Sequence, residues 1–329
     1  MDNIQSKRKT GGITMILIQH MQADERHQKR VEEVTNGNHQ VKLVKNISEI
    51  NDRSQIEILF TYGKEIKLET FKEMTSLKWI QLSSTGFDHL PKEYIQEKGI
   101  TVTTAKGAHA EPIAEYAFST MLYFSRKIDR FQELQKKKSW NRLDFPTELA
   151  GSTLVVLGMG YIGKEIARKA RAFDMHTIGI NRTGVVSEFF NETFRIEQLE
   201  EILPKADYLI LTLPLTSQTY HLIGQKQLHL LKPTAVVINI GRGELMDESA
   251  AIKVLQAHRI RGMAMDVFHQ EPLPEDSPLW DTEGLLLTPH MAAMTDRFLD
   301  RSIDRLIKNY QHYINCEKMI DVADFSKEY

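Results

Sequence analysis

The chain has 329 residues, of which 41% are hydrophobic and 26% are charged, and its formal net charge is -2. This composition is typical of an ordinary globular protein, and the length suggests about two domains. A net charge close to zero argues against a general nucleic-acid binder or membrane-surface binder. The single cysteine, Cys316, excludes a disulfide framework and a cysteine-built metal site. We therefore predict no metal and a cytoplasmic location.

The N-terminus carries the basic residues Lys7, Arg8 and Lys9 ahead of a short apolar run. This run resembles a signal peptide only weakly, because it is short and no small-residue cleavage site follows. No stretch of the chain reaches the roughly 20 apolar residues that a membrane span requires. We interpret residues 1–13 as a disordered lead or an expression remnant, and we expect no membrane association.

From residue 14 to about residue 108, short apolar runs alternate with amphipathic stretches. The expected strands are residues 14–20, 40–43, 56–62, 79–83 and 100–104. Helices are expected between them, for example at residues 26–34 and 68–74. Alternating strands and helices predict a mostly parallel sheet that is covered by helices.

Residues 111–130 are expected to form one helix, with Pro112 in its first turn and apolar residues at helical spacing. The polar stretch that follows, residues 131–149, contains three successive lysines and Trp140. It could be a solvated loop, an extended helix or a dimer arm, and the sequence does not decide among these.

The next expected strand, residues 153–157, leads into Gly158, Gly160 and Gly163, and a helical pattern follows at once. Strand, glycine turn and helix form the context in which G-x-G-x-x-G indicates dinucleotide binding. Gly158 permits the tight turn, Gly160 lets a pyrophosphate approach the backbone, and Gly163 lets the helix pack close to the strand. The sequence therefore predicts a dinucleotide cofactor.

The helix begins around Tyr161 and Ile162, where free N–H groups and the helix dipole would face the phosphates. A unit that prefers NAD usually has Asp or Glu about 20 residues further on. Here the following strand ends in Asn181, Arg182 and Thr183 instead. A carboxylate would repel a 2′-phosphate, whereas these three residues can donate hydrogen bonds to one. We predict NADP(H) as the preferred cofactor and NAD(H) as the alternative, although Arg182 could be an ordinary surface arginine.

The remaining expected strands are residues 176–180, 208–213, 235–240, 262–266 and 285–287, and a closing helix is expected at residues 296–313. Reactive side chains follow the last three of these strands. Arg242 follows the third strand, Asp266 and Glu271 lie at and beyond the end of the fourth, and His290 follows the fifth. Ligands of open α/β sheets bind at the carboxyl ends of the strands, so these groups could converge beside the cofactor.

Taken together and in order, these motifs resemble the D-isomer-specific 2-hydroxyacid dehydrogenase family. The matching pieces are the glycine fingerprint, Leu213-Pro214-Leu215-Thr216 with Thr219, Lys232-Pro233, residues 239–243, Asp266-Val267-Phe268 with Glu271-Pro272, and Thr288-Pro289-His290. The resemblance runs from about residue 76 to 315 and is dense from 149 to 292. Asp174 stands where the family often has Gly, and Asp tolerates a left-handed conformation.

The resemblance implies an α/β fold in which a Rossmann cofactor domain, residues 111–297, is inserted into a flavodoxin-like substrate domain. That second domain would comprise residues 15–110 and 298–329. It also implies a homodimer that forms through the cofactor domain.

The resemblance further assigns roles to single residues. Arg242 would bind the substrate carboxylate and carbonyl, and His290 would be the acid/base that gives a proton to the ketone oxygen. Glu271 would hydrogen-bond His290 and orient it, whereas the neighbouring His269 is interpreted as an exposed residue outside the site. Further cofactor contacts are implied at Leu213, Pro214, Thr219, Ile240, Gly241 and Asp266, besides Arg242 and His290. The substrate carboxylate would be received by the backbone of a loop at Ser84, Thr85 and Gly86.

The function implied is NAD(P)-dependent reduction of a small 2-oxo acid, of the glyoxylate or hydroxypyruvate type, to a D-2-hydroxy acid. The alternative is a nucleotide-sensing binding protein that resembles a corepressor, since such proteins can keep Arg242, Glu271 and His290. A formate dehydrogenase is a third possibility, but its pattern pairs the active histidine with Gln, and Glu271 argues against it.

Overall fold

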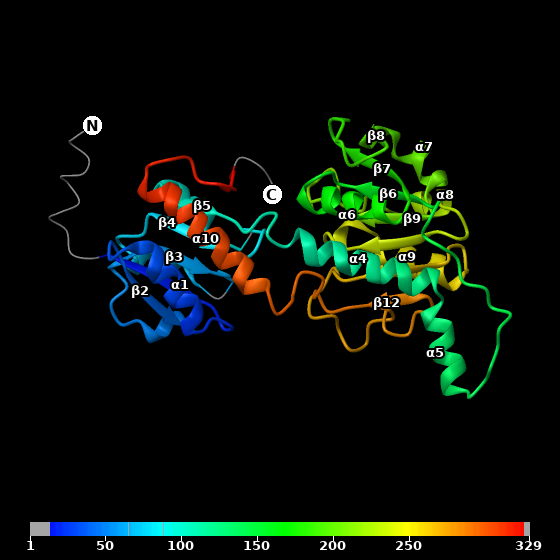
Figure 1. Ribbon diagram of the computed structural model, residues 1–329, viewed down its shortest axis with the longest axis horizontal. Helices are drawn as coiled ribbons and strands as arrows, with labels where there is room; N and C mark the ends of the chain where they lie inside the picture. Colours follow the sequence, from blue (N-terminus) through cyan, green and yellow to red (C-terminus); the bar gives the residue numbers. More distant parts are fainter. Residues whose placement is uncertain (1–13, 65, 88, 326–329) are drawn as a thin grey trace. The chain divides into compact units, whose positions relative to one another are not determined.

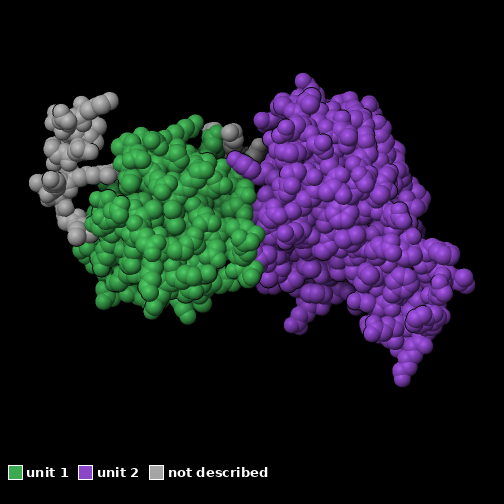
Figure 2. Space-filling model, in the orientation of Figure 1, with its two compact units in different colours: residues 1–108, 296–329 green, residues 109–295 purple. Residues whose placement is uncertain are grey.

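The computed structural model describes residues 14–64, 66–87 and 89–325, and the chain divides into two compact units (Figures 1 and 2). Unit 1 consists of Met1–Ala108 and Asp296–Tyr329, and unit 2 is His109–Thr295. The lead predicted at residues 1–13 lies outside the described residues.

Unit 1 is built on a parallel sheet of five strands in the order β2-β1-β3-β4-β5, which is the flavodoxin-like order. Its strands are β1 (Met15–Gln19), β2 (Gln40–Val44), β3 (Ile56–Thr61), β4 (Trp79–Leu82) and β5 (Thr101–Thr103). Its helices are α1 (Glu25–Thr35), α2 (Leu68–Glu73), α3 (Lys92–Glu97), α10 (Phe298–Ile314) and the 3-10 helix η2 (Ile47–Glu49). Strands β1 and β3 are buried along their whole lengths, as expected for a parallel sheet that is covered by helices.

Helix α10 returns from the end of the chain to complete unit 1, and it lies beside α1 (Figure 1). The Nη1 atom of Arg30 on α1 is 2.8 Å from a carboxylate oxygen of Asp300 on α10. Ser302 on α10 donates a hydrogen bond to the carbonyl of Ser83 at 3.1 Å. This bond holds the chain where β4 ends and the loop with the predicted substrate contacts begins.

Unit 2 is built on a parallel sheet of seven strands in the order β12-β11-β10-β9-β6-β7-β8. They are β6 (Thr153–Leu157), β7 (His176–Asn181), β8 (Glu192–Arg195), β9 (Tyr208–Leu211), β10 (Val236–Asn239), β11 (Gly262–Met265) and β12 (Leu285–Leu287). The order from β8 to β11 is the Rossmann order, with β12 added at one edge. The order reverses between β6 and β9, and the glycine turn follows β6 at this switch point, where such folds bind ligands.

The helices of unit 2 correct one prediction. They are α4 (Ala110–Ser125), α5 (Ile128–Lys136), α6 (Tyr161–Ala172), α7 (Leu199–Ile202), α8 (Gln225–Leu230), α9 (Glu248–Gln256) and the 3-10 helices η3 (Ile196–Gln198), η4 (Leu203–Lys205) and η5 (Gly243–Leu245). The single helix expected at residues 111–130 is wrong, because α4 ends at Ser125 and Lys127 takes a left-handed conformation before α5 begins. Apolar residues continue at helical spacing through the break, so the pattern alone does not reveal it.

The sheet of unit 2 separates two apolar cores. Val155 and Leu157 of β6 belong to one core, and Leu154 and Val156 belong to the other, as the alternation along a strand requires. Asp174, just before β7, has a φ of 53° and thus takes the expected left-handed conformation. Among the described residues, no helix is both long enough and apolar enough to cross a membrane.

Candidate active site

The turn after β6 has the geometry that the glycine fingerprint requires. Gly158 has a φ of 107°, and a Cβ atom on Gly163 would lie 1.9 Å from the carbonyl oxygen of Gly158. A Cβ on Gly160 would meet no atom within 4 Å, so the space beside this backbone is open. Helix α6 begins at Tyr161, and the N–H groups of Tyr161 and Ile162 lie in its first turn, ahead of the intrahelical hydrogen bonds. The turn fits a pyrophosphate group.

The end of β7 forms a turn that Asn181 organises. The carboxamide oxygen of Asn181 accepts hydrogen bonds from the backbone N–H groups of Thr183 at 2.9 Å and Gly184 at 2.5 Å. Its NH2 group lies 3.1 Å from the sulfur of Met159. Asn181 therefore shapes the turn, and Arg182 and Thr183 are the exposed side chains that the turn presents.

A second arginine at this turn escaped the sequence-based predictions. Arg195 ends the edge strand β8 and is the register partner of Asn181 on β7. Its Cγ atom would lie 2.9 Å from a Cβ atom on Gly184, so its side chain runs along the turn. Both Arg182 and Arg195 are exposed, and neither forms an ion pair with a carboxylate of the described residues. Two guanidinium groups at one turn that form no ion pair with a described carboxylate could bind an anionic group such as a phosphate.

The loops after β9 and β10 lie against each other. A Cβ atom on Gly241 would be 2.9 Å from the carbonyl oxygen of Leu213, so only glycine allows this approach. Thr219 donates its hydroxyl hydrogen to the carbonyl of Pro214 at 2.7 Å and thereby closes the first loop. Ile240 is buried at the base of the second loop. The structure thus brings these predicted cofactor residues to one edge of the sheet.

Arg242 is held by its own loop. The Asn239 side chain donates to the Arg242 carbonyl at 2.9 Å, and Arg242 Nη1 donates to the Gly241 carbonyl at 2.8 Å. The guanidinium is half-buried and forms no ion pair with a carboxylate in the described part of the chain. A Cβ atom on Gly243 would be 2.1 Å from the carbonyl carbon of residue 268, so the Arg242 segment lies directly on the segment after β11.

Asp266 is 2% exposed and is fully engaged in hydrogen bonds. Its carboxylate accepts from the Thr288 hydroxyl at 2.5 Å and from the N–H groups of Met291 at 2.8 Å and Ala292 at 2.9 Å. Tyr116 of α4, which the sequence did not single out, lies 2.8 Å from the same Thr288 hydroxyl. Burial raises the pKa of the Tyr116 phenol, so it remains protonated. Asp266 therefore fixes the loop after β12, and its predicted contact with a nicotinamide stays a prediction.

Glu271 and His290 come together, although 18 residues separate them in the sequence. Glu271 Oε2 lies 2.8 Å from His290 Nδ1, and Glu271 Oε1 accepts the N–H of Phe268 at 3.1 Å. The His290 side chain is 46% exposed, and its Nε2 atom has no hydrogen-bond partner among the described residues. A carboxylate on one ring nitrogen and a free second nitrogen make His290 a suitable proton donor.

The predicted carboxylate loop belongs to unit 1 and follows β4. The carbonyl of Ser84 accepts the N–H of Ala105 at 2.9 Å, and the Ser84 hydroxyl donates to the Gly86 carbonyl at 3.2 Å. Thr85 between them is exposed. The loop thus lies at the carboxyl edge of the sheet in unit 1, the edge at which ligands bind in such folds.

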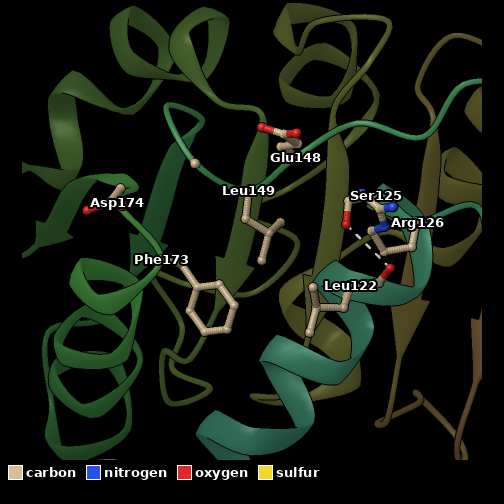
Figure 3. Close-up of a pocket in the computed structure, with 8 residues that line it drawn as sticks. Leu122, Ser125, Arg126, Glu148, Leu149, Phe173 and Asp174 are labelled. Carbon is tan, nitrogen blue, oxygen red and sulfur yellow. Dashed lines mark hydrogen bonds between the residues drawn. The ribbon is translucent and has the colours of Figure 1, made fainter.

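A separate hollow lies at the amino-terminal edge of the sheet in unit 2 (Figure 3). Its lining comes from the end of α4 and from the segments before β6 and β7: Leu122, Ser125, Arg126, Glu148, Leu149, Ala150, Phe173 and Asp174. Since Arg242, Glu271 and His290 follow the carboxyl ends of their strands, this hollow is not the predicted active site.

Comparison with known proteins identifies the family. The family model "D-isomer specific 2-hydroxyacid dehydrogenase, NAD binding domain" matches residues 118–292. A D-3-phosphoglycerate dehydrogenase of Methanocaldococcus jannaschii is 34% identical over 71% of this chain, which spans only 45% of that protein. A glyoxylate reductase of Korarchaeum cryptofilum is 32% identical over 74% of this chain and 75% of that protein. A D-isomer specific 2-hydroxyacid dehydrogenase family protein from Aeromonas salmonicida has a crystal structure with a TM-score of 0.85 at 26% identity, over 95% of this chain and 99% of that one.

These matches confirm the predicted family, the α/β fold class with a Rossmann domain and a substrate domain, and the expectation of an NAD(P) cofactor. The relatives named above are dehydrogenases and reductases, and they give the corepressor alternative no support. The chain belongs to the D-isomer specific 2-hydroxyacid dehydrogenase family of NAD(P)-dependent oxidoreductases.

Proposed function

We propose that the chain reduces a small 2-oxo acid, of the glyoxylate or hydroxypyruvate type, to the D-2-hydroxy acid with NADPH. The observation that carries this proposal is the 2.8 Å contact between Glu271 and His290, which leaves the second ring nitrogen of His290 without a described partner. The glyoxylate reductase among the relatives supports the substrate class. Residues 111–297 would form the cofactor domain, and residues 15–110 with 298–329 the substrate domain.

The reaction joins a hydride and a proton to one carbonyl group. A nicotinamide cofactor held at the glycine turn would supply the hydride for the carbonyl carbon. Arg242 would bind the substrate carboxylate with its planar guanidinium, which has no described acidic partner to compete. His290 would give the proton from Nε2 to the carbonyl oxygen, and Glu271 on Nδ1 would hold the ring in place. The backbone of Ser84 to Gly86 is proposed as a further contact of the substrate carboxylate.

The preference for NADP(H) is supported by the turn at the end of β7. A 2′-phosphate would find Arg182, Thr183 and Arg195 around the turn that Asn181 shapes. No carboxylate stands at the end of this strand, where a family member that prefers NAD usually has one. Arg195 adds a second guanidinium to the donors that the sequence predicted.

We also propose a homodimer that forms through unit 2. Three apolar side chains after α5 are highly exposed: Trp140 is 92%, Leu143 is 82% and Phe145 is 75% exposed. Exposed apolar groups that gather in one segment mark a protein interaction site. The hollow of Figure 3 offers an apolar wall of Leu122, Leu149 and Phe173 in the same unit. Sedimentation should give the mass of a dimer, and Trp140→Ser with Leu143→Ser should give a monomer.

A cytoplasmic location completes the proposal. Cys316 is exposed and unpaired, and an exposed thiol persists in a reducing compartment. Fractionation of cells that express the full chain would test this directly.

The test of the activity is a panel of 2-oxo acids with NADPH and NADH, followed by the absorbance of the reduced nicotinamide. We expect turnover of glyoxylate and hydroxypyruvate and a higher kcat/KM with NADPH. The absence of turnover across the panel with either nucleotide would contradict the proposed activity.

A further inference from the structure

Three loop segments meet beside the predicted catalytic groups: residues 221–223, 243–247 and 268–271. The first two are joined by backbone hydrogen bonds, of which the shortest runs from the N–H of His221 to the carbonyl of Glu244 at 2.7 Å. The second segment follows Arg242 directly, and the third ends at Glu271. Whatever joins the second and third segments therefore connects the groups that bind and protonate the substrate.

His269 makes this connection. Its Nε2 atom lies 2.8 Å from the carbonyl oxygen of Met246, and its backbone N–H donates to the Glu248 carboxylate at 2.8 Å. The imidazole stacks on the ring of His221, with 5.2 Å between the centroids and 20° between the planes. Its Nδ1 atom is 3.9 Å from Glu248 Oε2. One side chain thus contacts both of the other segments.

His269 is connected to Glu271 through the backbone of its neighbour Phe268. The residue before it, Phe268, donates its backbone N–H to Glu271 Oε1 at 3.1 Å. The other carboxylate oxygen of Glu271 lies 2.8 Å from His290 Nδ1. The 268–269 peptide lies against Gly243, where a Cβ atom would be 2.1 Å from the Phe268 carbonyl carbon and 2.5 Å from the His269 nitrogen. Phe268 thus contacts both sides, and a shift of its backbone would disturb Glu271 and the Arg242 segment at once.

We propose that His269 is a positioning residue for the reduction. Its ring links the 268–271 segment to Met246 through a hydrogen bond. This link keeps the Glu271 carboxylate aligned with His290, and it keeps the Arg242 loop in place. The inference rests on the proposed function, because it assigns His269 an effect on that reaction. His269 is exposed, as expected from the sequence, but the proposal gives it a part in the site.

The contacts of the His269 ring can be separated from those of its backbone. The N–H bond to Glu248 belongs to the backbone and survives any substitution at this position. His269→Ala removes the bond to Met246 and the stack on His221, whereas His269→Gln keeps a nitrogen donor near the place of Nε2. The exposed His258, which has a φ of 49°, provides a matched control as His258→Asn, because Asn tolerates this conformation.

Steady-state kinetics with NADPH and the best 2-oxo acid of the panel form the first test. We expect His269→Ala to lower kcat about tenfold, since small misplacements at reacting groups lower rates steeply. The KM for NADPH should stay within about twofold, because the glycine turn after β6 and the turn after β7, which carry many of the predicted nucleotide contacts, do not depend on His269. His269→Gln should recover most of kcat, and His258→Asn should match the wild type. Equal kcat values for His269→Ala and the wild type would overturn the inference.

A double-mutant cycle with Glu271→Gln decides whether His269 acts through Glu271. If it does, the effect of His269→Ala should shrink to about twofold in the Glu271→Gln background, because linked residues are not additive. An undiminished loss there, or a loss with His269→Gln equal to that with His269→Ala, would contradict the positioning role. If the wild-type protein turned over no 2-oxo acid, the proposed function itself would be overturned. If the wild type were active but the losses of kcat in the two single variants were additive, only the positioning role would be overturned.

Discussion

The two ends of the carboxyl edge in unit 2 are built differently. At the β10–β12 end, Asp266, Glu271 and His290 are tied to one another's loops by hydrogen bonds of 2.5–3.1 Å. At the β7–β8 end, Arg182 and Arg195 are exposed and form no ion pair with the described carboxylates. Groups that stabilise a transition state must be fixed before the reaction, whereas groups that select a ligand can remain open until it binds.

Because of this difference, we expect substitutions at the two ends to have different effects on the kinetics. Changes at the β10–β12 end should lower kcat with both nucleotides, because the chemical step is the same for NADPH and NADH. Changes at the β7–β8 end should alter the preference between the nucleotides and leave kcat close to the wild-type value. A change at one end that had the effect expected for the other end would contradict this division.

The largest effect is expected for His290→Ala. Loss of the proton donor should lower kcat by at least about a hundredfold, which is the usual scale of general acid catalysis. The measurement is kcat at saturating 2-oxo acid and NADPH, with His258→Asn as the matched histidine control. A kcat near that of the control would remove His290 from the mechanism.

A smaller loss is expected for Glu271→Gln. The amide can still accept a hydrogen bond from His290 Nδ1, but it no longer offers a negative charge at 2.8 Å. We expect kcat to fall about tenfold, since a charge-assisted hydrogen bond exceeds a neutral one by about 1.4 kcal/mol. The same kinetics with NADH should show the same factor. A loss confined to one nucleotide would contradict the assignment of Glu271 to the chemical step.

Asn181→Asp should act on selection alone. The carboxylate can accept the same two N–H groups that the Asn181 oxygen accepts, so the turn should persist. A negative charge there would repel a 2′-phosphate and suit a ribose hydroxyl, so the ratio of kcat/KM with NADPH to that with NADH should fall about tenfold. An unchanged ratio would overturn our account of the cofactor preference.

The smallest effect is expected for Arg195→Ala. One exposed guanidinium beside a phosphate contributes about 1 kcal/mol, so the KM for NADPH should rise about fivefold. The KM for NADH should stay unchanged, because NADH has no 2′-phosphate. Lys253→Ala, an exposed residue on α9, removes the same charge elsewhere and should alter neither KM. Equal rises in both KM values would show that Arg195 does not read the phosphate.

The sequence predicted the fold and the chemical groups because both depend on local patterns. Strand β6, the three glycines and the helix after them are contiguous, and the order of the motifs places Arg242, Glu271 and His290 after three separate strands. Parallel strands have their carboxyl ends at one edge, so the convergence of these groups follows from the fold.

Features that depend on pairing between distant segments escaped prediction. Strand β8 is a short, half-exposed edge strand, so its sequence lacks the apolar run of a buried strand. Without β8, nothing in the sequence places Arg195 beside Asn181. The contact of His269 with Met246 joins residues 23 positions apart and depends on the close approach at Gly243. The break between α4 and α5 was missed because helical spacing continues through it.

The most direct test measures kcat/KM and kcat for glyoxylate reduction by the wild type, His290→Ala and Arg195→Ala, each with NADPH and with NADH. We expect His290→Ala to lower kcat with both nucleotides by the same factor of at least about a hundred and to keep the nucleotide preference. We expect Arg195→Ala to weaken the preference for NADPH and to keep kcat. A normal kcat for His290→Ala, or an unchanged preference for Arg195→Ala, would contradict the division between a fixed catalytic end and an open selecting end.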